Sequence, residues 1–104
     1  MTGEPDQMMI VTGRIVARPE TFDELLAASL EHVRRSRAEP GCISHAVQRD
    51  VEDEHRLVFF ERWADRASLD DHFRVPASAD FVRTVTRLAA QPPTIEIYQA
   101  TRTR

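Results

Sequence analysis

The order of apolar patterns along the chain constrains its fold more than any other feature of the sequence. Runs of strand length that are rich in β-branched and aromatic residues alternate with segments whose apolar residues recur at helical spacing. The strand-like runs are residues 8–18, 42–49, 55–64 and 94–102, and the helical segments are residues 18–41, 66–74 and 76–90. The resulting order, β-α-β-β-α-β, predicts an α+β, ferredoxin-like fold with an antiparallel sheet.

The first helical segment carries signals for both of its ends. Thr21 and Glu24 have the spacing of a capping box, and Pro40-Gly41 ends the helix. Three arginines near its end suit the helix dipole, and we expect them in solvent; they are Arg34, Arg35 and Arg37. The stripe expected to face the sheet consists of Phe22, Leu25, Leu26, Ser29, Leu30 and Val33.

The later connections are short and polar. The acidic residues 50–54 join two strand-like runs, which predicts a hairpin. Asp65 precedes the short helical segment and is a suitable N-cap, and Pro92-Pro93 ends the last helical segment. We expect residues 1–7 to be a disordered or frayed lead-in and residues 8–104 to form a single domain.

The composition excludes several functional classes. The net charge of −3 makes nucleic acid an unsuitable partner. All 14 basic residues are arginine, so Schiff-base chemistry and a Walker-type phosphate loop are excluded. With only 3 glycines, the chain has no glycine-rich nucleotide loop.

The sequence also bears on the compartment. No apolar run approaches the ~20 residues that a membrane helix needs, and the acidic first residues do not resemble a signal peptide. Cys42 is the only cysteine, which excludes an intrachain disulfide and a cysteine-based metal cluster. We therefore expect a cytoplasmic protein without a membrane partner, in which Cys42 is packed and inert.

The first strand predicts that the chain pairs with a second copy of itself. Ile10, Val11, Ile15 and Val16 place apolar side chains on both of its faces. In the predicted fold, helices cover one face of the sheet and leave the other open. An apolar open face needs a cover, so we expect a homodimer that packs through its sheet faces.

Three groups of residues together resemble a known family. They are Glu39-Pro40-Gly41-Cys42 at a helix-to-strand junction, Glu61-Arg62-Trp63 at the end of a strand, and Leu69 with His72 on the next helix. The combined pattern, EPGC…FERW-x-D-x-x-x-L-x-x-H, resembles the antibiotic-biosynthesis monooxygenase domain in its quinol monooxygenase branch. The resemblance covers residues 8–98 and implies a dimeric α/β barrel with a pocket between sheet and helices.

This resemblance also implies a chemistry. Members of known activity oxidise quinols or anthrones with O2, without metal or flavin, whereas other relatives bind and degrade haem. The sequence departs from the family pattern at three points. Ala77 replaces the histidine that follows a proline in the quinol branch, the chain has no asparagine, and Val82 occupies the position of the haem-ligating histidine. These departures disfavour haem degradation.

Two residues are candidates for catalysis. His72 lies beside Leu69 and Phe73 on the short helix and could act as a general base that deprotonates the substrate, or it could simply pack there. Glu61 shares a strand face with Phe59 and Trp63. It is either a structural ion-pair partner of an arginine or a pocket acid or base with a raised pKa.

The candidate substrate-binding residues have simpler alternatives. Trp63, Phe59, Leu69 and Phe73 could line an aromatic binding site or could be ordinary core residues. Arg83 could stabilise a substrate oxyanion, although Arg83 and Arg87 at helical spacing are more typical of a solvated face.

The remaining histidines do not suggest a metal site. His32 comes late in the first helix, where we expect it in solvent, His45 lies in the second strand, and His55 lies at the end of the hairpin. No two histidines have the local spacing of a ligand pair, so we predict no metal and no cofactor, although distant residues could converge in space.

The functional hypothesis is therefore a cofactor-independent monooxygenase whose partners are O2 and a small electron-rich aromatic substrate. One alternative is a non-catalytic binding or stress-response module with the same pocket and dimer. A second, disfavoured alternative is an enzyme that binds or degrades haem.

Overall fold

The computed structural model describes residues 5–104, so part of the predicted lead-in, residues 1–4, lies outside the described residues. The first strand already begins at Gln7, which pairs with Thr101 of the last strand. Among the described residues, no helix is long and apolar enough to cross a membrane.

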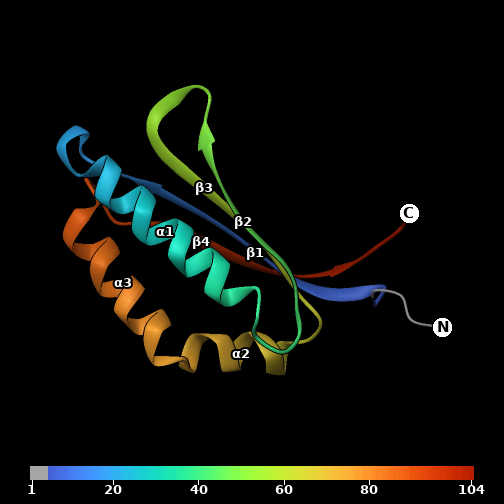
Figure 1. Ribbon diagram of the computed structural model, residues 1–104. Coiled ribbons are helices and arrows are strands. Elements are labelled where there is room, and N and C mark those ends of the chain that lie inside the picture. Colours follow the sequence, from blue (N-terminus) through green and yellow to red (C-terminus); the bar gives the residue numbers. More distant parts are fainter. Residues whose placement is uncertain (1–4) are drawn as a thin grey trace.

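Four strands form one antiparallel sheet (Figure 1). They are β1 (Gln7–Val16), β2 (Cys42–Asp50), β3 (Asp53–Trp63) and β4 (Thr94–Thr101). Their order across the sheet is β2-β3-β1-β4, and each neighbouring pair is antiparallel. This arrangement confirms the predicted ferredoxin-like α+β fold.

The helices lie together on one face of the sheet (Figure 1). They are α1 (Phe22–Ser36), α2 (Arg66–Arg74) and α3 (Pro76–Leu88), with a short 3-10 turn η1 (Pro19–Thr21) before α1. The predicted N-cap of α2 is confirmed, because the Asp65 carboxylate accepts a hydrogen bond of 2.8 Å from the Ser68 amide.

The predicted capping box at the start of α1 is wrong. Thr21 instead donates its hydroxyl to the carbonyl of Leu88 at 2.7 Å and accepts from the Arg18 amide at 3.2 Å. The reason is that Pro19 starts a 3-10 turn ahead of the α-helix, so the Thr21 side chain ties this turn to the end of α3.

Two apolar clusters fill the space between helices and sheet. The first joins α1, α3 and the sheet, and contains Ile15, Ala17, Phe22, Leu25, Val33, Leu57, Phe59, Val85 and Leu88. The second lies under α2 and contains Met9, Val11, Trp63 and Leu69. The inward residues of β1 and β3 alternate along each strand, which places Phe59, Glu61 and Trp63 on the helix side.

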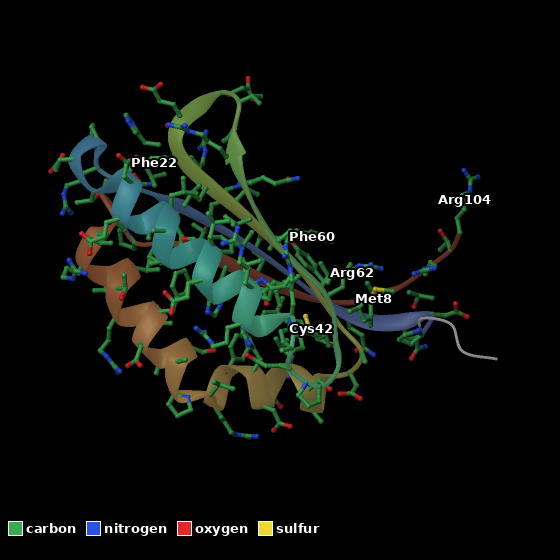
Figure 2. All side chains as sticks on the ribbon, viewed as in Figure 1. Met8, Phe22, Cys42, Phe60, Arg62 and Arg104 are labelled. Carbon is green, nitrogen blue, oxygen red and sulfur yellow. The ribbon has the colours of Figure 1, made fainter. Side chains whose placement is uncertain are left out.

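The opposite face of the sheet carries exposed aromatic side chains. Phe60 and Arg62 alternate with the inward residues of β3, so they point away from the helices (Figure 2). Phe60 is 44% exposed and Tyr98 on β4 is 47% exposed. No helix of the described chain covers this face.

Candidate functional site

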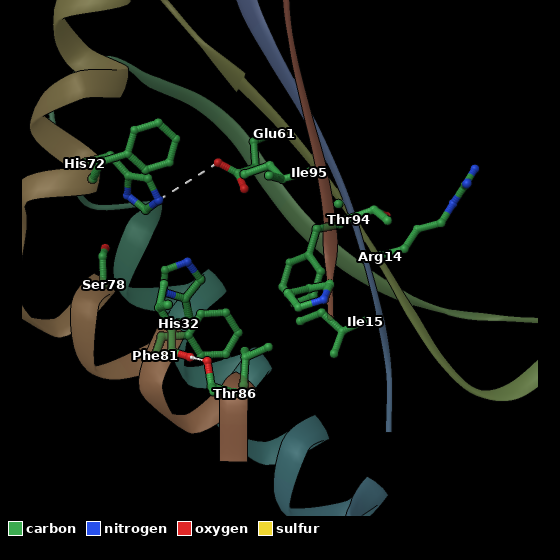
Figure 3. A pocket seen from close by; sticks show the side chains of 16 residues that line it. Arg14, Ile15, His32, Glu61, His72, Ser78, Phe81, Thr86, Thr94 and Ile95 are labelled. Carbon is green, nitrogen blue, oxygen red and sulfur yellow. Dashed lines mark hydrogen bonds and ion pairs between the residues drawn. The ribbon is translucent and has the colours of Figure 1, made fainter. Parts of the chain in front are cut away.

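A cavity of about 170 Å³ lies between the sheet and the helices (Figure 3). Most of its wall is apolar, and its polar end is formed by His32, Glu61 and His72. The apolar lining comes from β1, β3, α2, α3 and the start of β4, through Ile15, Phe59, Phe73, Phe81, Val82, Val85, Pro93 and Ile95. A space of this kind suits a small, largely apolar ligand that carries one polar group.

His72 is held at the polar end by a carboxylate. The junction between α1 and β2 brings Glu39 beside α2, where Glu39 Oε1 lies 2.8 Å from His72 Nδ1. Since a carboxylate only accepts hydrogen bonds, Nδ1 carries the proton, and the lone pair of a neutral His72 is on Nε2. Nε2 lies 3.9 Å from Glu61 Oε1, and the side chain of His72 is 3% exposed.

Glu61 is a buried carboxylate with several N–H neighbours. Trp63 Nε1 donates to Glu61 Oε1 at 3.0 Å, and His45 Nε2 lies 3.2 Å from the same oxygen. Burial alone would raise the pKa of Glu61, but the N–H groups of His45 and Trp63 outweigh it and lower this pKa. Of the two alternatives for Glu61, the pocket acid with a raised pKa is therefore wrong. The alternation of residues along a strand does not reveal these donors.

The partners of Glu61 also differ in kind from the expected arginine. They are Trp63 and two histidines, which approach from the same strand, from β2 and from α2. Burial of a carboxylate without such donors would be costly. Ring nitrogens therefore surround the Glu61 carboxylate, and no guanidinium is among these neighbours.

His32 is buried, contrary to the prediction that it lies in solvent. It is 5% exposed and stacks on Phe81 at a ring distance of 4.2 Å, and its Nδ1 lies 2.7 Å from the Arg35 guanidinium. Burial lowers the pKa of His32 to about 3, and repulsion by the Arg35 guanidinium and by any proton carried on His45 or His72 acts in the same direction. A sequence signal existed, since His32 follows the buried Leu25 by seven residues, or two helical turns.

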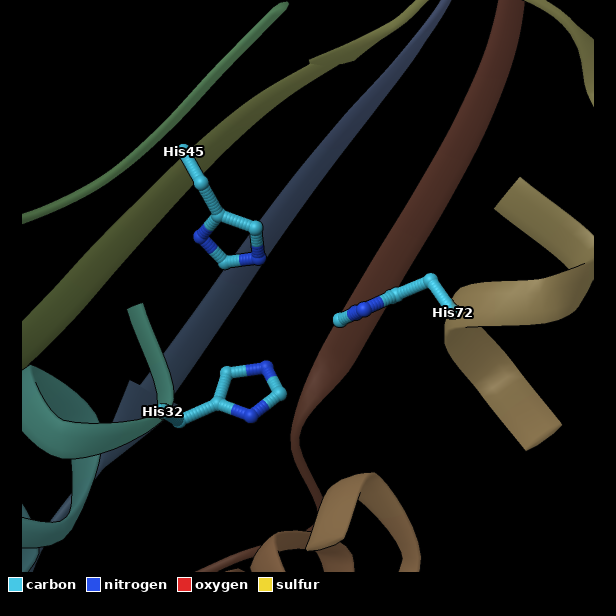
Figure 4. Close-up of side chains that lie close together, drawn as sticks. All are labelled: His32, His45 and His72. Atoms are coloured by element: carbon cyan, nitrogen blue, oxygen red, sulfur yellow. The ribbon is translucent and has the colours of Figure 1, made fainter. Parts of the chain in front are cut away.

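The fold brings together three histidines that are far apart in the chain (Figure 4). His32, His45 and His72 come from α1, β2 and α2, and all three are buried. One ring nitrogen of each lies within 4.8 Å of the corresponding atom of the other two. Local spacing could not reveal this cluster, because it depends on packing between elements.

The candidate substrate-binding residues fall into two groups. Phe59 and Phe73 line the cavity. Trp63 and Leu69 are fully buried outside its lining, where the Trp63 ring packs against His72 at 4.6 Å. Arg83 is exposed on α3 and pairs with Asp80, so it does not line the cavity either.

Several lining residues were not among the sequence candidates. Phe81, Val82 and Val85 belong to the apolar face of α3, and Ile95 lies at the start of β4. Helical spacing predicts that the α3 residues share a face, but it does not separate core from cavity wall. Ala77, where the quinol branch has a histidine, lines a separate groove between α1 and α3 beside His32.

Fold and cavity define a class, namely ferredoxin-like α+β domains with a pocket between sheet and helices. The sequence pattern of the family described as "Antibiotic biosynthesis monooxygenase" matches residues 8–84. The chain belongs to this family.

Individual relatives agree with this assignment. The chain is 37% identical to an uncharacterized protein of Synechocystis sp., sll1783, over 95% of this chain and 67% of that protein. It superposes on the structure of Rv0793 from Mycobacterium tuberculosis with a TM-score of 0.83 and 27% identity, covering 88% of this chain and 92% of the other. A structure described as an antibiotic biosynthesis monooxygenase matches with a TM-score of 0.83 and 30% identity, over 90% and 99% of the two chains.

Proposed function

We propose that this protein is a monooxygenase that uses O2 to oxidise a small electron-rich aromatic substrate, such as a quinol or an anthrone. The observation that carries the proposal is the cavity, in which aromatic and aliphatic walls lead to Nε2 of His72 and the carboxylate of Glu61. The description of a related structure as an antibiotic biosynthesis monooxygenase supports the same type of reaction.

His72 is the proposed general base. Its Nδ1–H is held by Glu39 at 2.8 Å, which fixes the ring and leaves Nε2 free to accept a proton. Removal of a proton from the substrate makes an anion that transfers an electron to O2 more readily. The ionised carboxylate of Glu61, 3.9 Å from Nε2, would stabilise the imidazolium that forms.

The proposed reaction balances without a cofactor. For an anthrone, one electron passes from the substrate anion to O2, and the resulting radical and superoxide combine with a proton into a hydroperoxide. Cleavage of its O–O bond leaves one oxygen atom as the new carbonyl oxygen. The other oxygen leaves as water with the remaining hydrogen of that carbon. The substrate supplies all the electrons, so we propose that neither metal nor flavin nor haem takes part.

We also propose that the working unit is a homodimer that packs through its sheet faces. Phe60 and Tyr98 are half-exposed aromatic residues on the face that lacks helices. Ile95 and Ile97 are also exposed, but they lie on the helix side of the edge strand β4, where a copy that extends around this edge would cover them. Burial of these side chains against a second copy would remove apolar surface from water.

The test of the proposed function is O2 uptake by metal-stripped protein with a panel of quinols, anthrones and hydroxynaphthalenes. We expect uptake that survives a chelator and falls by ~10²-fold or more in His72→Ala, the range typical of a lost general base. His55→Ala is the matched control, because His55 does not line the cavity.

A binding assay separates lost chemistry from lost binding. The quinone product should bind His72→Ala and the parent protein with similar affinity. Undiminished uptake in His72→Ala would remove His72 from the mechanism. Ligand binding without any O2 uptake would instead favour the non-catalytic binding module.

A further inference from the structure

We propose that His32, His45 and His72, together with Glu61, form a binding site for one divalent first-row transition-metal ion. The three histidine nitrogens lie within 4.8 Å of one another, and the rings face a common point from α1, β2 and α2 (Figure 4). Imidazole nitrogen with one carboxylate oxygen is a donor set that zinc, cobalt, nickel, copper and iron accept.

His45 provides evidence of a missing ligand. It is 1% exposed, and within residues 5–104 neither of its ring nitrogens makes a hydrogen bond of good geometry. Its Nε2 lies 3.2 Å from Glu61 Oε1, close enough to lower the pKa of that carboxyl but too poorly aligned for a full hydrogen bond. Since buried polar atoms are nearly always partnered, an ion bonded to one of these nitrogens would remove half of this deficit. Ligation through Nε2 places the proton of a neutral His45 on Nδ1.

His72 already has the surroundings of a metal ligand. Metal-bound histidines commonly donate their second N–H to a carboxylate, which orients the ring and makes the ligating nitrogen more basic. The 2.8 Å contact between His72 Nδ1 and Glu39 is of this kind, and it directs Nε2 towards Glu61 and the other two rings.

Glu61 supplies negative charge beside two of the three histidines. Its Oε1 lies 3.2 Å from His45 Nε2 and 3.9 Å from His72 Nε2, so the same oxygen can reach an ion held between these rings. A divalent cation would offset the charge of this buried carboxylate more fully than neutral N–H groups do.

The ligand atoms must move closer to bind an ion. With metal–nitrogen bonds of about 2.0–2.1 Å, ligands in a tetrahedral site are separated by roughly 3.3 Å. The present separations of up to 4.8 Å therefore require each ring to shift by less than about 1 Å. We expect small rotations of the three side chains to provide this shift.

Arg35 opposes metal binding in the present arrangement. Its guanidinium lies 2.7 Å from His32 Nδ1, and a guanidinium only donates, so a neutral His32 carries its proton on Nε2. Ligation through Nε2 requires that proton to move to Nδ1 and Arg35 to swing away. Arg35 is partly exposed, although its Nε is buried. Removal of Arg35 should therefore strengthen metal binding.

This inference rests on observations separate from the proposed function, but the two share His72 Nε2 and the carboxylate of Glu61. An ion bonded to His72 Nε2 would prevent that nitrogen from accepting a substrate proton. If the proposed function holds, one equivalent of Zn²⁺ should inhibit O2 uptake, and a chelator should restore it.

The experiment is calorimetric titration of chelator-treated protein with Zn²⁺ at pH 7.5, without substrate or O2 measurement. We expect one ion per chain. His45→Phe, which keeps an aromatic ring in place, should weaken binding at least 100-fold, whereas His55→Phe should not change it. Arg35→Ala should tighten binding about tenfold, and Arg34→Ala, its exposed neighbour, should have no effect.

A second measurement covers the case in which a variant does not fold. X-ray absorption of the unaltered protein loaded with Zn²⁺ should show three imidazole ligands. A smaller number of imidazoles, absence of stoichiometric binding, or equal losses in His45→Phe and His55→Phe would overturn the proposed site. Because these readouts need no turnover, failure of the oxygenase proposal would leave them unaffected.

Discussion

The charge of Glu61 illustrates how the neighbours of a single residue determine its chemistry. The inward face of β3 places this carboxyl among apolar side chains, which on its own favours the protonated acid. The N–H groups of His45 and Trp63 reverse that preference and lower its pKa. Glu61 is therefore suited to stabilise a positive charge that forms beside it, either an imidazolium or a metal ion.

The charge of Glu61 also affects the pKa of the nearby Cys42 thiol. Burial raises the pKa of its thiol, and the charges of Glu61 and Glu39 raise it further. Because the thiolate is the reactive form, we expect Cys42 in the folded protein to react with iodoacetamide at pH 8 at least ~10-fold more slowly than in urea. Equal rates in the two states would contradict the raised pKa.

The raised pKa of Cys42 also makes the stability of the fold depend on pH. A group whose pKa is raised by folding contributes stability below its unfolded pKa and loses that contribution as the pH rises through the folded value. For Cys42 the contribution should begin to decline above about pH 8.5, the ordinary cysteine value. Replacement of Cys42 by serine should remove this part of the alkaline decline in urea denaturation.

Strand periodicity was enough to predict which side chains of β3 share a face, because successive residues point to opposite sides. It could not show that His45 of β2 lies directly across from Glu61, since that contact depends on the register between two strands. Apolar spacing on α1 does not predict the burial of His32, because this side chain is polar. The buried face of α1 extends beyond the predicted stripe to His32 and Ser36.

At the scale of elements, the junction between α1 and β2 couples the fold to the site. Gly41 in this junction has φ of 82°, a left-handed conformation that side chains disfavour. A Cβ added there would lie 2.4 Å from the Ser68 Cβ on α2. The junction thus packs against the same helix that carries His72, and it holds Glu39 beside that histidine.

Gly41→Ala should therefore destabilise the protein by more than ~1–2 kcal/mol, the cost of left-handed backbone alone, because the clash with Ser68 adds to it. Urea denaturation measures this loss. Gly13→Ala is the control, since a Cβ at Gly13 meets its nearest atoms at 3.6 and 3.7 Å, which is ordinary contact. Similar midpoints for Gly41→Ala and the parent protein would contradict the packing argument.

The order and type of the elements were predictable because each carries its own local signal, such as Asp65 as the N-cap of α2. The predicted stop at Pro40-Gly41 lies beyond the end of α1, which is at Ser36. Their ends were less predictable, as the η1 turn before α1 shows, because Thr21 bonds to the distant Leu88. The cavity itself could not be derived. Its wall combines six elements, and only their packing separates Phe59, which lines it, from Trp63, which does not.

At the scale of the whole molecule, the open face of the sheet and the cavity meet at β4. Thr94 and Ile95 line the cavity, and Ile95 is still 59% exposed. A second copy packed over this edge and over the adjoining face would cover both. Dimerisation would then shield the polar end of the site from water as well as stabilise a small core.

Phe60→Glu tests this arrangement. Phe60 lies on the open face and is 44% exposed, so a charge there should not disturb the folded chain. In a symmetric dimer through that face, however, two carboxylates would be brought together in an apolar interface. We expect the dissociation constant of the dimer to rise by ~100-fold or more, because unpaired interfacial charges cost several kcal/mol.

Light scattering at micromolar concentration measures the molar mass, and hence the oligomeric state, of both proteins. The parent protein should scatter as twice the chain mass of 11.9 kDa, and Phe60→Glu should approach the mass of one chain. Val51→Glu, at the fully exposed tip of the β2–β3 hairpin, controls for the added charge and should remain dimeric. A parent protein that scatters as one chain would remove the dimer and leave the edge of the cavity at β4 open to solvent. If Phe60→Glu stays dimeric, the two copies associate through another surface. The proposal that a second copy covers the cavity edge at β4 would then be wrong.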